Sequence, residues 1–457
     1  MLSIVLAVMI IPTASPTAAS PQPPASPAAS PTPKPERFSL HAQSTVTQQY
    51  HEGFPAAYSG AQSLYSQPDY ARTFDVTLYA GAQLWKGAAF YIDPELDEGF
   101  GLGNPGAPGQ PYNGTFGVAG FVSGEAYKVG SAPSYARVQR IFLRQTFNIG
   151  GDLQTVDPDI NQLGGSITTR SLTLTAGKLA VTDVFDNNVY AHDPRNDFLN
   201  WSIIDMGSFD YAADSWGYTY GLSAELAGNT STLRLGLYQL SKVPNDIAIE
   251  HQPFLQYSTI LEYEKRISLF GGRPGAVKAL AYYDDGYFGS YADAVAAARG
   301  TGRVPTTADV RSKHLKAGGG VNVAQEIAPH IGVFARASAM NGTYEADEFT
   351  EIDRSLSGGV SMDGGLYGRP NDTLGIALAF NALSGPAQRY FAAGGLGVLI
   401  GDGGLTYGGE QIQETYYKFG IKAYSALTAD YQHITDPGYN TVRGPVSVFG
   451  LRYHVNF

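Results

Sequence analysis

Two short segments of this chain carry rows of opposite charge that could bind a polar solute. Arg140 and Arg144 are four residues apart, and Asp93, Glu95 and Asp97 are spaced by two. In an extended strand, these spacings place side chains on one face. Guanidinium groups opposite carboxylates would orient a hydroxyl-rich solute and offer it paired hydrogen-bond donors and acceptors. The pattern predicts non-covalent recognition of such a solute.

We expect these charges, together with the carboxylate of Glu125, to form or border the narrowest part of a water-filled passage. A second interpretation is that the same ion pairs only brace an inward-folded loop, because ion-pair networks are commonly structural. The spacing is compatible with both. Under the first interpretation, the constriction residues are Arg140, Arg144, Asp93, Glu95, Asp97 and Glu125.

Catalytic and metal-binding interpretations have less support. The chain contains no cysteine, which excludes thiol nucleophiles and zinc ribbons. His192 and Asp193 near Asp186 resemble part of a charge relay, but no serine stands in a nucleophile-elbow pattern. Asp183, Asp186 and Asn187 lack the glycine and terminal glutamate of an EF-hand loop. We therefore expect that the protein is not an enzyme and needs neither a metal ion nor a cofactor.

The elements that must position these charges alternate in the manner of membrane-crossing β-strands. In residues 449–457, every odd position is apolar or aromatic, and the even positions are glycine, arginine, histidine and asparagine. A strand of about 9–11 residues with one apolar and one polar face can cross a bilayer beside an aqueous lumen. Residues 74–85, 88–97 and 416–431 alternate similarly, and Asp284-Asp285-Gly286 is typical of a turn. The terminal Phe457 is similar to the signature through which outer-membrane barrels engage the barrel-assembly machinery.

Counting strands with their connections predicts an all-β fold, a 16-stranded antiparallel transmembrane β-barrel. The roughly 420 residues after the first 37, at about 25 per strand and connection, give 16 or 17 strands, and an even number is expected. No later stretch is long and apolar enough for a spanning helix. A soluble all-β sandwich or propeller would not require an aromatic carboxyl end. The net charge of -11 argues against nucleic acid as a partner.

The first 37 residues are expected to lie outside the barrel. Residues 1–20 contain an apolar run of signal-peptide length followed by small residues, and residues 21–37 form a spacer rich in proline and alanine. Residues 38–457 are the predicted barrel domain. This order predicts export through the inner membrane to the outer membrane of a Gram-negative bacterium.

Several motifs of the chain closely resemble those of the carbohydrate-selective porins of the OprB type. They are GKLAVTDVFDNN at 177–188, YAHDPR at 190–195, FLNW at 198–201, PELDEGFG at 94–101, GEAYK at 124–128, RIFLRQTF at 140–147 and RGPVSVFGLR at 443–452. The resemblance implies passive, carbohydrate-selective diffusion of monosaccharides such as glucose and other small sugars. It also implies outer-membrane lipid and lipopolysaccharide as surroundings. A monomer and a homotrimer both remain open, as do a general or anion-preferring porin and, less favoured, a barrel lipid hydrolase.

Aromatic side chains provide a second set of candidates for the sugar path. The apolar C–H faces of a pyranose can stack on flat rings, and alternation places Tyr79, Tyr91, Phe142 and Trp85 on inward faces. The competing interpretation is that tyrosine and tryptophan form girdles at the membrane interfaces. We favour the girdle for Trp85, which lies at a strand end.

Overall fold

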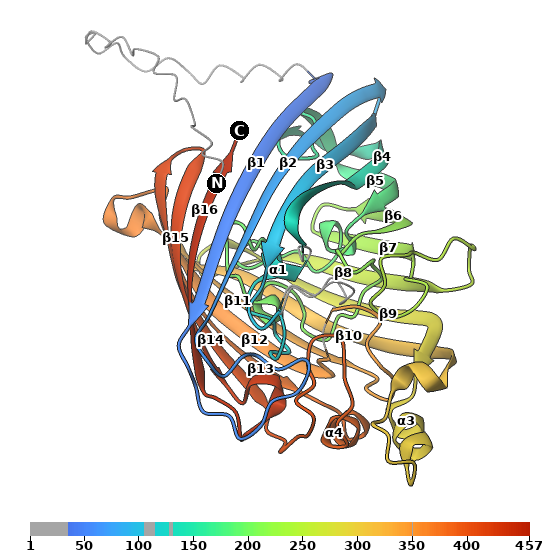
Figure 1. The fold of residues 1–457 in the computed structure, drawn as a ribbon. Helices are drawn as coiled ribbons and strands as arrows, with labels where there is room; N and C mark the ends of the chain where they lie inside the picture. Colours follow the sequence, from blue (N-terminus) through green and yellow to red (C-terminus); the bar gives the residue numbers. More distant parts are fainter. Residues whose placement is uncertain (1–34, 105–114, 128–130, 350) are drawn as a thin grey trace, which may run out of the picture.

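The chain forms a closed barrel of sixteen antiparallel strands, as predicted (Figure 1). The computed structural model describes residues 35–104, 115–127, 131–349 and 351–457. Each strand pairs with its neighbours in sequence, and β1 closes the barrel against β16. The signal-peptide-like segment and most of the spacer lie outside the described residues.

The first eight strands are β1 (Phe38–His51), β2 (Asp69–Trp85), β3 (Ala88–Phe100), β4 (Ser131–Val156), β5 (Gly165–Leu179), β6 (Thr219–Ala227), β7 (Ser231–Gln239) and β8 (Tyr257–Leu269). The other eight are β9 (Arg273–Gly289), β10 (Arg311–Ala328), β11 (Ile331–Met340), β12 (Arg354–Asp363), β13 (Thr373–Ala382), β14 (Glu410–Lys422), β15 (Ser425–Thr435) and β16 (Val446–Asn456). The helices are α1 (Gly124–Tyr127), α2 (Trp201–Ile204), α3 (Tyr291–Ala298), α4 (Gly385–Ala392), η1 (Val181–Asp183), η2 (Thr307–Val310), η3 (Gly364–Tyr367) and η4 (Pro437–Tyr439).

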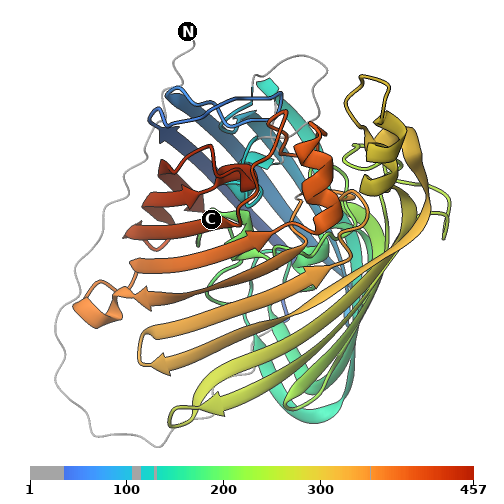
Figure 2. The same ribbon diagram turned by 90° about the horizontal axis from the view of Figure 1, so that it is seen from below.

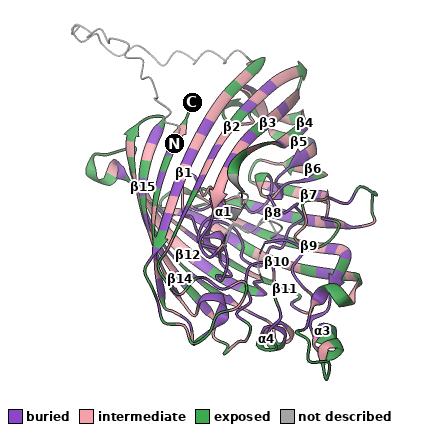
Figure 3. Cartoon of the chain, in the orientation of Figure 1, coloured by how far each residue is buried: buried purple, intermediate pink, exposed green. Residues whose placement is uncertain are grey.

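Buried and more exposed residues alternate along the strands (Figure 3), with apolar side chains on the outer surface and polar ones on the inner surface. On β16, Leu451 and Tyr453 are 45% and 44% exposed, whereas Arg452 is 0% and His454 is 4% exposed. Apolar side chains that face outward meet lipid, and polar ones that face inward meet water or other chain segments. The strand predicted from the C-terminal pattern is therefore confirmed in both position and orientation.

The two ends of the barrel differ in their connections. Short turns lie at the end that also carries the start of β1 and the end of β16, and most connections at the other end are long. Outer-membrane barrels have short periplasmic turns and longer extracellular loops, so the short-turn end is the periplasmic one. Helices α3 and α4 lie at the long-loop end (Figures 1 and 2), where the rings of Tyr291 and Tyr390 are 4.9 Å apart. Among the described residues, no helix has the length and apolar character needed to cross a membrane.

Part of the lumen is filled by connections that fold inward from the long-loop end. The connection between β5 and β6, residues 180–218, is largely buried and is called the inward segment below. Its α2 residue Trp201 stacks on Phe121 at 5.1 Å and on Phe349 at 5.0 Å, which belong to two other connections. These rings form an apolar core inside the barrel. The lumen is therefore narrower than a barrel of sixteen strands would leave by itself.

Two details of the predicted strands are wrong. Residues 416–431 are not one strand, because β14 ends at Lys422 and β15 begins at Ser425. Asp284-Asp285-Gly286 is not a turn but lies within β9, paired with β10. Asp285 forms a 3.2 Å ion pair with Lys313 of β10, so acidic residues are stabilised in a strand that extends toward the long loops.

Candidate channel lining

The inner face of β3 carries a column of side chains along the lumen. Asp97, Glu95, Asp93 and Tyr91 are each at most 3% exposed. Asp97 lies nearest the long loops and Tyr91 nearest the periplasmic turns, because β3 runs toward the long-loop end. The alternation predicted that these side chains share one face, and the structure places them so.

A β-bulge in β4 changes which of its charged residues face inward. The pairing with β3 skips Gln139, so this residue is extra and shifts the alternation by one position. Arg140 and Arg144 lie on the inner face, as predicted. Arg137 also lies there, and its Nη2 is 3.1 Å from Asp214 Oδ2 of the inward segment. Strict alternation would have turned Arg137 outward.

Arg195 of the inward segment lies among three carboxylates. Its Nη2 is 3.0 Å from Asp75 Oδ1 and 3.0 Å from Glu95 Oε2, and its Nε is 3.1 Å from Glu125 Oε2. Its Nη1 donates a 3.2 Å hydrogen bond to the Tyr79 hydroxyl. Burial lowers the pKa of Arg195, but Asp75, Glu125 and Glu95 outweigh this and raise the pKa well above its ordinary value. The guanidinium is therefore charged and joins the inward segment to β2, β3 and α1.

Arg140 both faces the lumen and braces the inward segment. Its Nε and Nη2 donate to the two carboxylate oxygens of Asp183 at 2.7 and 2.6 Å. Asp183 belongs to η1 at the start of the inward segment, and Asp93 lies 3.9 Å from Arg140 Nη1. The side chains of Arg140 and Asp183 remain 16% and 26% exposed, so both still contact solvent. The Arg140–Asp183 pair therefore braces the inward segment and stays accessible to a solute in the lumen.

The predicted aromatic candidates are almost completely covered. The rings of Tyr91 and Phe142 stack at 5.0 Å, and the Arg144 guanidinium carbon lies 5.5 and 5.2 Å from their centroids. Tyr79, Tyr91 and Phe142 are at most 4% exposed, so they form walls rather than open stacking faces. Trp85 is 57% exposed, and its indole N–H donates a hydrogen bond to the outward-facing Gln145. The inward placement of Trp85 is therefore wrong, and its position agrees with the girdle interpretation.

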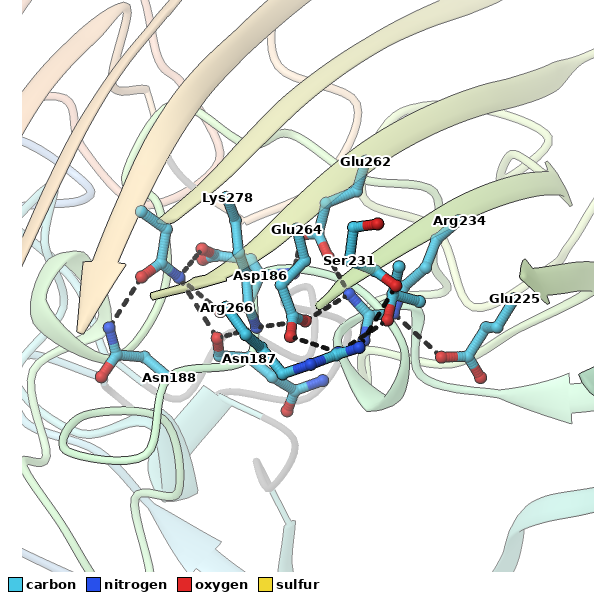
Figure 4. A network of polar contacts seen from close by, with 12 residues as sticks. Asp186, Asn187, Asn188, Glu225, Ser231, Arg234, Glu262, Glu264, Arg266 and Lys278 are labelled. Atoms are coloured by element: carbon cyan, nitrogen blue, oxygen red, sulfur yellow. Dashed lines mark hydrogen bonds and ion pairs between the residues drawn. The ribbon is translucent and has the colours of Figure 1, made fainter. Parts of the chain in front are cut away.

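Asp186 joins the inward segment to the part of the barrel wall that β8 to β11 form (Figure 4). Its backbone N–H donates to Glu262 of β8 at 2.8 Å. Its Oδ1 accepts from Asn322 of β10 at 2.6 Å and from Arg336 of β11 at 3.1 Å. Both Asp186 and Arg336 are at most 2% exposed. This carboxylate is therefore an anchor for the segment that narrows the lumen.

A second group of charges adjoins this anchor on the inner wall (Figure 4). Arg234 of β7 donates to Glu225, Glu262 and Glu264 at 2.9, 2.7 and 2.9 Å. Lys278 of β9 lies 3.9 Å from Glu264 and donates to a backbone carbonyl of the inward segment. With Arg266 of β8, whose Nη1 lies 3.2 Å from Glu264 Oε1, three cations face three carboxylates on the wall from β6 to β9.

Strands β14 and β16 hold the inward segment from the other side. Glu414 accepts hydrogen bonds from the backbone N–H groups of Leu199 at 2.6 Å and Asn200 at 3.0 Å. Arg452 donates to the carbonyls of Asp197, at 2.9 Å, and Pro194. Charged side chains on the barrel wall therefore satisfy backbone groups that would otherwise be buried without partners.

The structure brings two of the six predicted constriction residues, Glu95 and Glu125, together through Arg195, a residue that the prediction missed. Glu95 and Glu125 meet at Arg195, whereas Arg140 meets Asp183 and Arg144 meets the backbone carbonyl of Asn161 at 2.8 Å. Arg195 closes the YAHDPR motif, directly after an Asp-Pro pair. The sequence signal that could have identified Arg195 as a functional residue was its charge, at a turn within a motif that resembles the family's. Within the described ranges, no group of acidic or histidine side chains is arranged to hold a metal ion.

Comparison with known proteins identifies the family and shows solved structures with a similar fold. Residues 61–457 match the family model of carbohydrate-selective porins, OprB family. The structure is similar to OprB of Pseudomonas putida, with a TM-score of 0.68, 14% identity, and coverage of 92% of this chain and 94% of that one. It is less similar to the outer membrane channel DcaP of Acinetobacter baumannii, with a TM-score of 0.49, 10% identity, and coverage of 92% and 97%. No curated protein sequence matches the chain.

Proposed function

Because the chain belongs to the OprB family of carbohydrate-selective porins, we propose that it admits monosaccharides such as glucose, and other small sugars, by passive diffusion. The family and the barrel place it in the Gram-negative outer membrane as a carbohydrate-selective channel. The proposal adds the size class of the solute and the residues that select it.

The observation that carries this proposal is the cluster of Arg195 with Asp75, Glu95 and Glu125 beside the Arg140–Asp183 pair. Both lie where the inward segment meets the inner faces of β2, β3 and β4. A pore discriminates by its diameter, by the donors and acceptors that line it and by the charge at its narrowest point. The solvent-accessible Arg140–Asp183 pair offers a sugar both donors and acceptors, and the buried Arg195 cluster holds the inward segment that narrows the passage beside it.

The second candidate, an anion-preferring porin, is favoured by the cations on the inner faces of β4 and β5. They are Arg137, Arg140, Arg144 and Lys178. The pairing of Arg137 and Arg140 with Asp214 and Asp183 argues against it, because a paired guanidinium attracts a diffusing anion weakly.

Liposome swelling with sugars graded by size tests the proposal. We expect glucose to enter faster than a disaccharide, and Arg140→Ala and Arg144→Ala to change the rates. Arg303→Ala is the matched control, because Arg303 is 71% exposed at the long-loop end. A channel that conducts anions with strong preference and takes up no glucose would refute the sugar assignment. Unchanged flux of every sugar in both arginine variants would refute the residue assignment only.

We also propose the remaining features of the chain's route and assembly. Residues 1–20 direct export through the inner membrane, residues 21–37 form a spacer, and Phe457 engages the barrel-assembly machinery. Phe457 is 71% exposed, which leaves it accessible to such a partner. Both a monomer and a homotrimer are compatible with a barrel whose outer surface is apolar, and cross-linking in native membranes separates them.

A further inference from the structure

A cavity of about 480 Å³ opens at the periplasmic end of the barrel, away from the Arg195 cluster. It lies between the inner faces of β3 to β6 and the turn that joins β4 to β5. Its polar lining residues include Gln83, Arg144, Thr146, Thr173 and Glu225, and Tyr91 forms part of one wall. Pockets that bind small molecules typically have volumes of about 300–1,000 Å³. The cavity is therefore large enough for one monosaccharide.

One wall of this cavity is a periplasmic turn that folds into the barrel mouth. Residues 157–164 close on themselves, because the backbones of Asp159 and Gln162 exchange two 3.0 Å hydrogen bonds. Asn161 adopts a positive φ of 54° at the tip, a conformation that asparagine tolerates better than most residues. The turn thus forms a compact unit whose tip can point toward the lumen.

Contacts with three inward residues hold this turn in place. The side-chain amide of Asn161 donates a 2.8 Å hydrogen bond to Asp93 Oδ2. The backbone carbonyl of Asn161 accepts a 2.8 Å hydrogen bond from Arg144 Nη1. The backbone N–H of Leu163 donates to the Tyr91 hydroxyl at 3.2 Å. Periplasmic turns are usually short and solvent-facing. A turn bonded to three lumen residues instead acts as part of the channel wall.

The first described residues of the chain hold the turn at its C-terminal end, Gly164. Glu36 and Gly164 exchange two hydrogen bonds of 2.9 Å, one between backbones and one from the Gly164 N–H to the Glu36 carboxylate. The Arg37 carbonyl accepts from the backbone of Gln83 at 2.8 Å. The segment that leads into β1 therefore fixes both the turn and the adjacent end of β2.

The cavity lies apart from the Arg195 cluster and the Arg140–Asp183 pair, although Arg144 of the predicted constriction set lines it. Tyr91 precedes Glu95 by four residues on β3, which corresponds to about 13 Å along a strand. Asp93, with its bonds to Asn161 and its approach to Arg140, lies between them. A solute that has passed Arg195 would meet this cavity before it enters the periplasm.

We propose that this cavity is a second binding site for a single pyranose, an exit site at the periplasmic mouth. The proposal rests on the sugar specificity assigned above and adds a place where the sugar pauses. Thr146 and Thr173, whose hydroxyls are 3.1 Å apart, together with Glu225, Gln83 and Arg144, can exchange hydrogen bonds with a ring of hydroxyl groups. The Tyr91 wall can contact an apolar C–H edge.

Protection of an introduced cysteine tests this site, because the natural chain has none. Thr173→Cys places a thiol in the cavity with almost no change of size. Ser268→Cys is the matched control, since Ser268 is exposed on β8 at the same end and does not line the cavity. A water-soluble methanethiosulfonate reagent should label both variants, reconstituted in liposomes, in the absence of sugar.

Glucose should slow the labelling of Thr173→Cys and leave that of Ser268→Cys unchanged. At a glucose concentration about ten times the dissociation constant, roughly one site in ten is free, so the rate should fall about tenfold. Glycerol at equal osmolarity should protect neither variant. Thr146→Cys provides a second variant with the same expectation if Thr173→Cys does not fold.

Three results would be decisive. Equal slowing of both variants, or slowing by glycerol, would overturn the exit site. Absence of protection in channels that take up glucose in the swelling assay would overturn the exit site and leave the sugar channel standing. Absence of glucose uptake by the unmodified protein would overturn the proposed function itself.

Discussion

Arg195 and Glu95 form a buried ion pair, with 3.0 Å between Nη2 and Oε2, that joins the inward segment to the barrel wall. The two residues are 100 positions apart in sequence. The arginine comes from a connection between strands and the glutamate from the inner face of β3. The pair therefore couples the shape of the lumen to the position of one loop, and this coupling leads to the first prediction.

Arg195→Gln should destabilise the protein and shift its ion selectivity toward cations. The substitution removes a guanidinium that Asp75, Glu95 and Glu125 share, and loss of one partner of a buried ion pair typically costs about 3–5 kcal/mol. Urea unfolding in lipid vesicles and the reversal potential in a salt gradient measure the two effects. Arg303→Gln, at an exposed pair, should change neither, and equal behaviour of the two variants would disprove the role of Arg195.

Asp186→Ala should loosen the inward segment and raise the single-channel conductance. The change leaves Arg336 without its carboxylate partner and removes the shortest hydrogen bond that Asn322 donates, while both side chains keep bonds to backbone carbonyls. A buried charge without its partner favours a structure in which the loop moves and water enters. Planar-bilayer recording and limited proteolysis within residues 180–218 measure the effect. Asp309→Ala at the exposed pair is the control, and unchanged conductance with unchanged cleavage in Asp186→Ala would contradict the anchor role.

Deletion of Gln139 should cost the barrel little more than Gln139→Ala. Without the extra residue, Val138 would directly precede Arg140, and regular alternation would keep Arg137 and Arg140 on the inner face, so the Arg137–Asp214 pair should survive. Both variants lose the hydrogen bonds that the Gln139 amide donates to Glu95 and Asp97. The urea midpoints of the two folded barrels should therefore be similar. A much lower midpoint for the deletion would show that Arg137 has turned toward lipid, where an arginine costs about 2–4 kcal/mol at the bilayer midplane.

The loops at the extracellular end should become less tightly closed as the pH rises toward 8. Burial raises the pKa of Glu351 from 4.5 to about 8, although the backbone N–H groups of Val398 and Leu399 oppose this shift. Because the folded pKa is raised, the stabilising contribution is complete below about 4.5 and is lost as the pH rises through the folded value.

Amide exchange of Val398 and Leu399, measured from pH 6 to 9 and corrected for intrinsic rates, tests this expectation. Exchange should accelerate in the natural protein as the pH passes 8. Glu351→Gln cannot ionise and should exchange at a corrected rate that is independent of pH. The same pH dependence in both proteins would assign the effect to another group.

The positions of the strands could be predicted because they depend on a local repeat. The C-terminal pattern of residues 449–457 specified β16 and its lipid-facing side, and the alternation in 88–97 placed Asp93, Glu95 and Asp97 on one face. Period-two alternation reflects contact with lipid on one side and water on the other, so it is visible in any strand by itself. The inward placement of Trp85 was wrong, and Arg137 was not among the predicted lumen residues, because single bulges shift the phase of the alternation.

The sequence by itself therefore determined the class of barrel, the number of strands, the family and the charged residues that face the lumen. Only the tertiary structure decided which partners those charges have. Arg195 reaches Glu95, Asp186 reaches Arg336 and Asn161 reaches Asp93 across separations of 68 to 150 residues. No local period records such contacts, because they depend on how an irregular connection folds back once the barrel has closed around it.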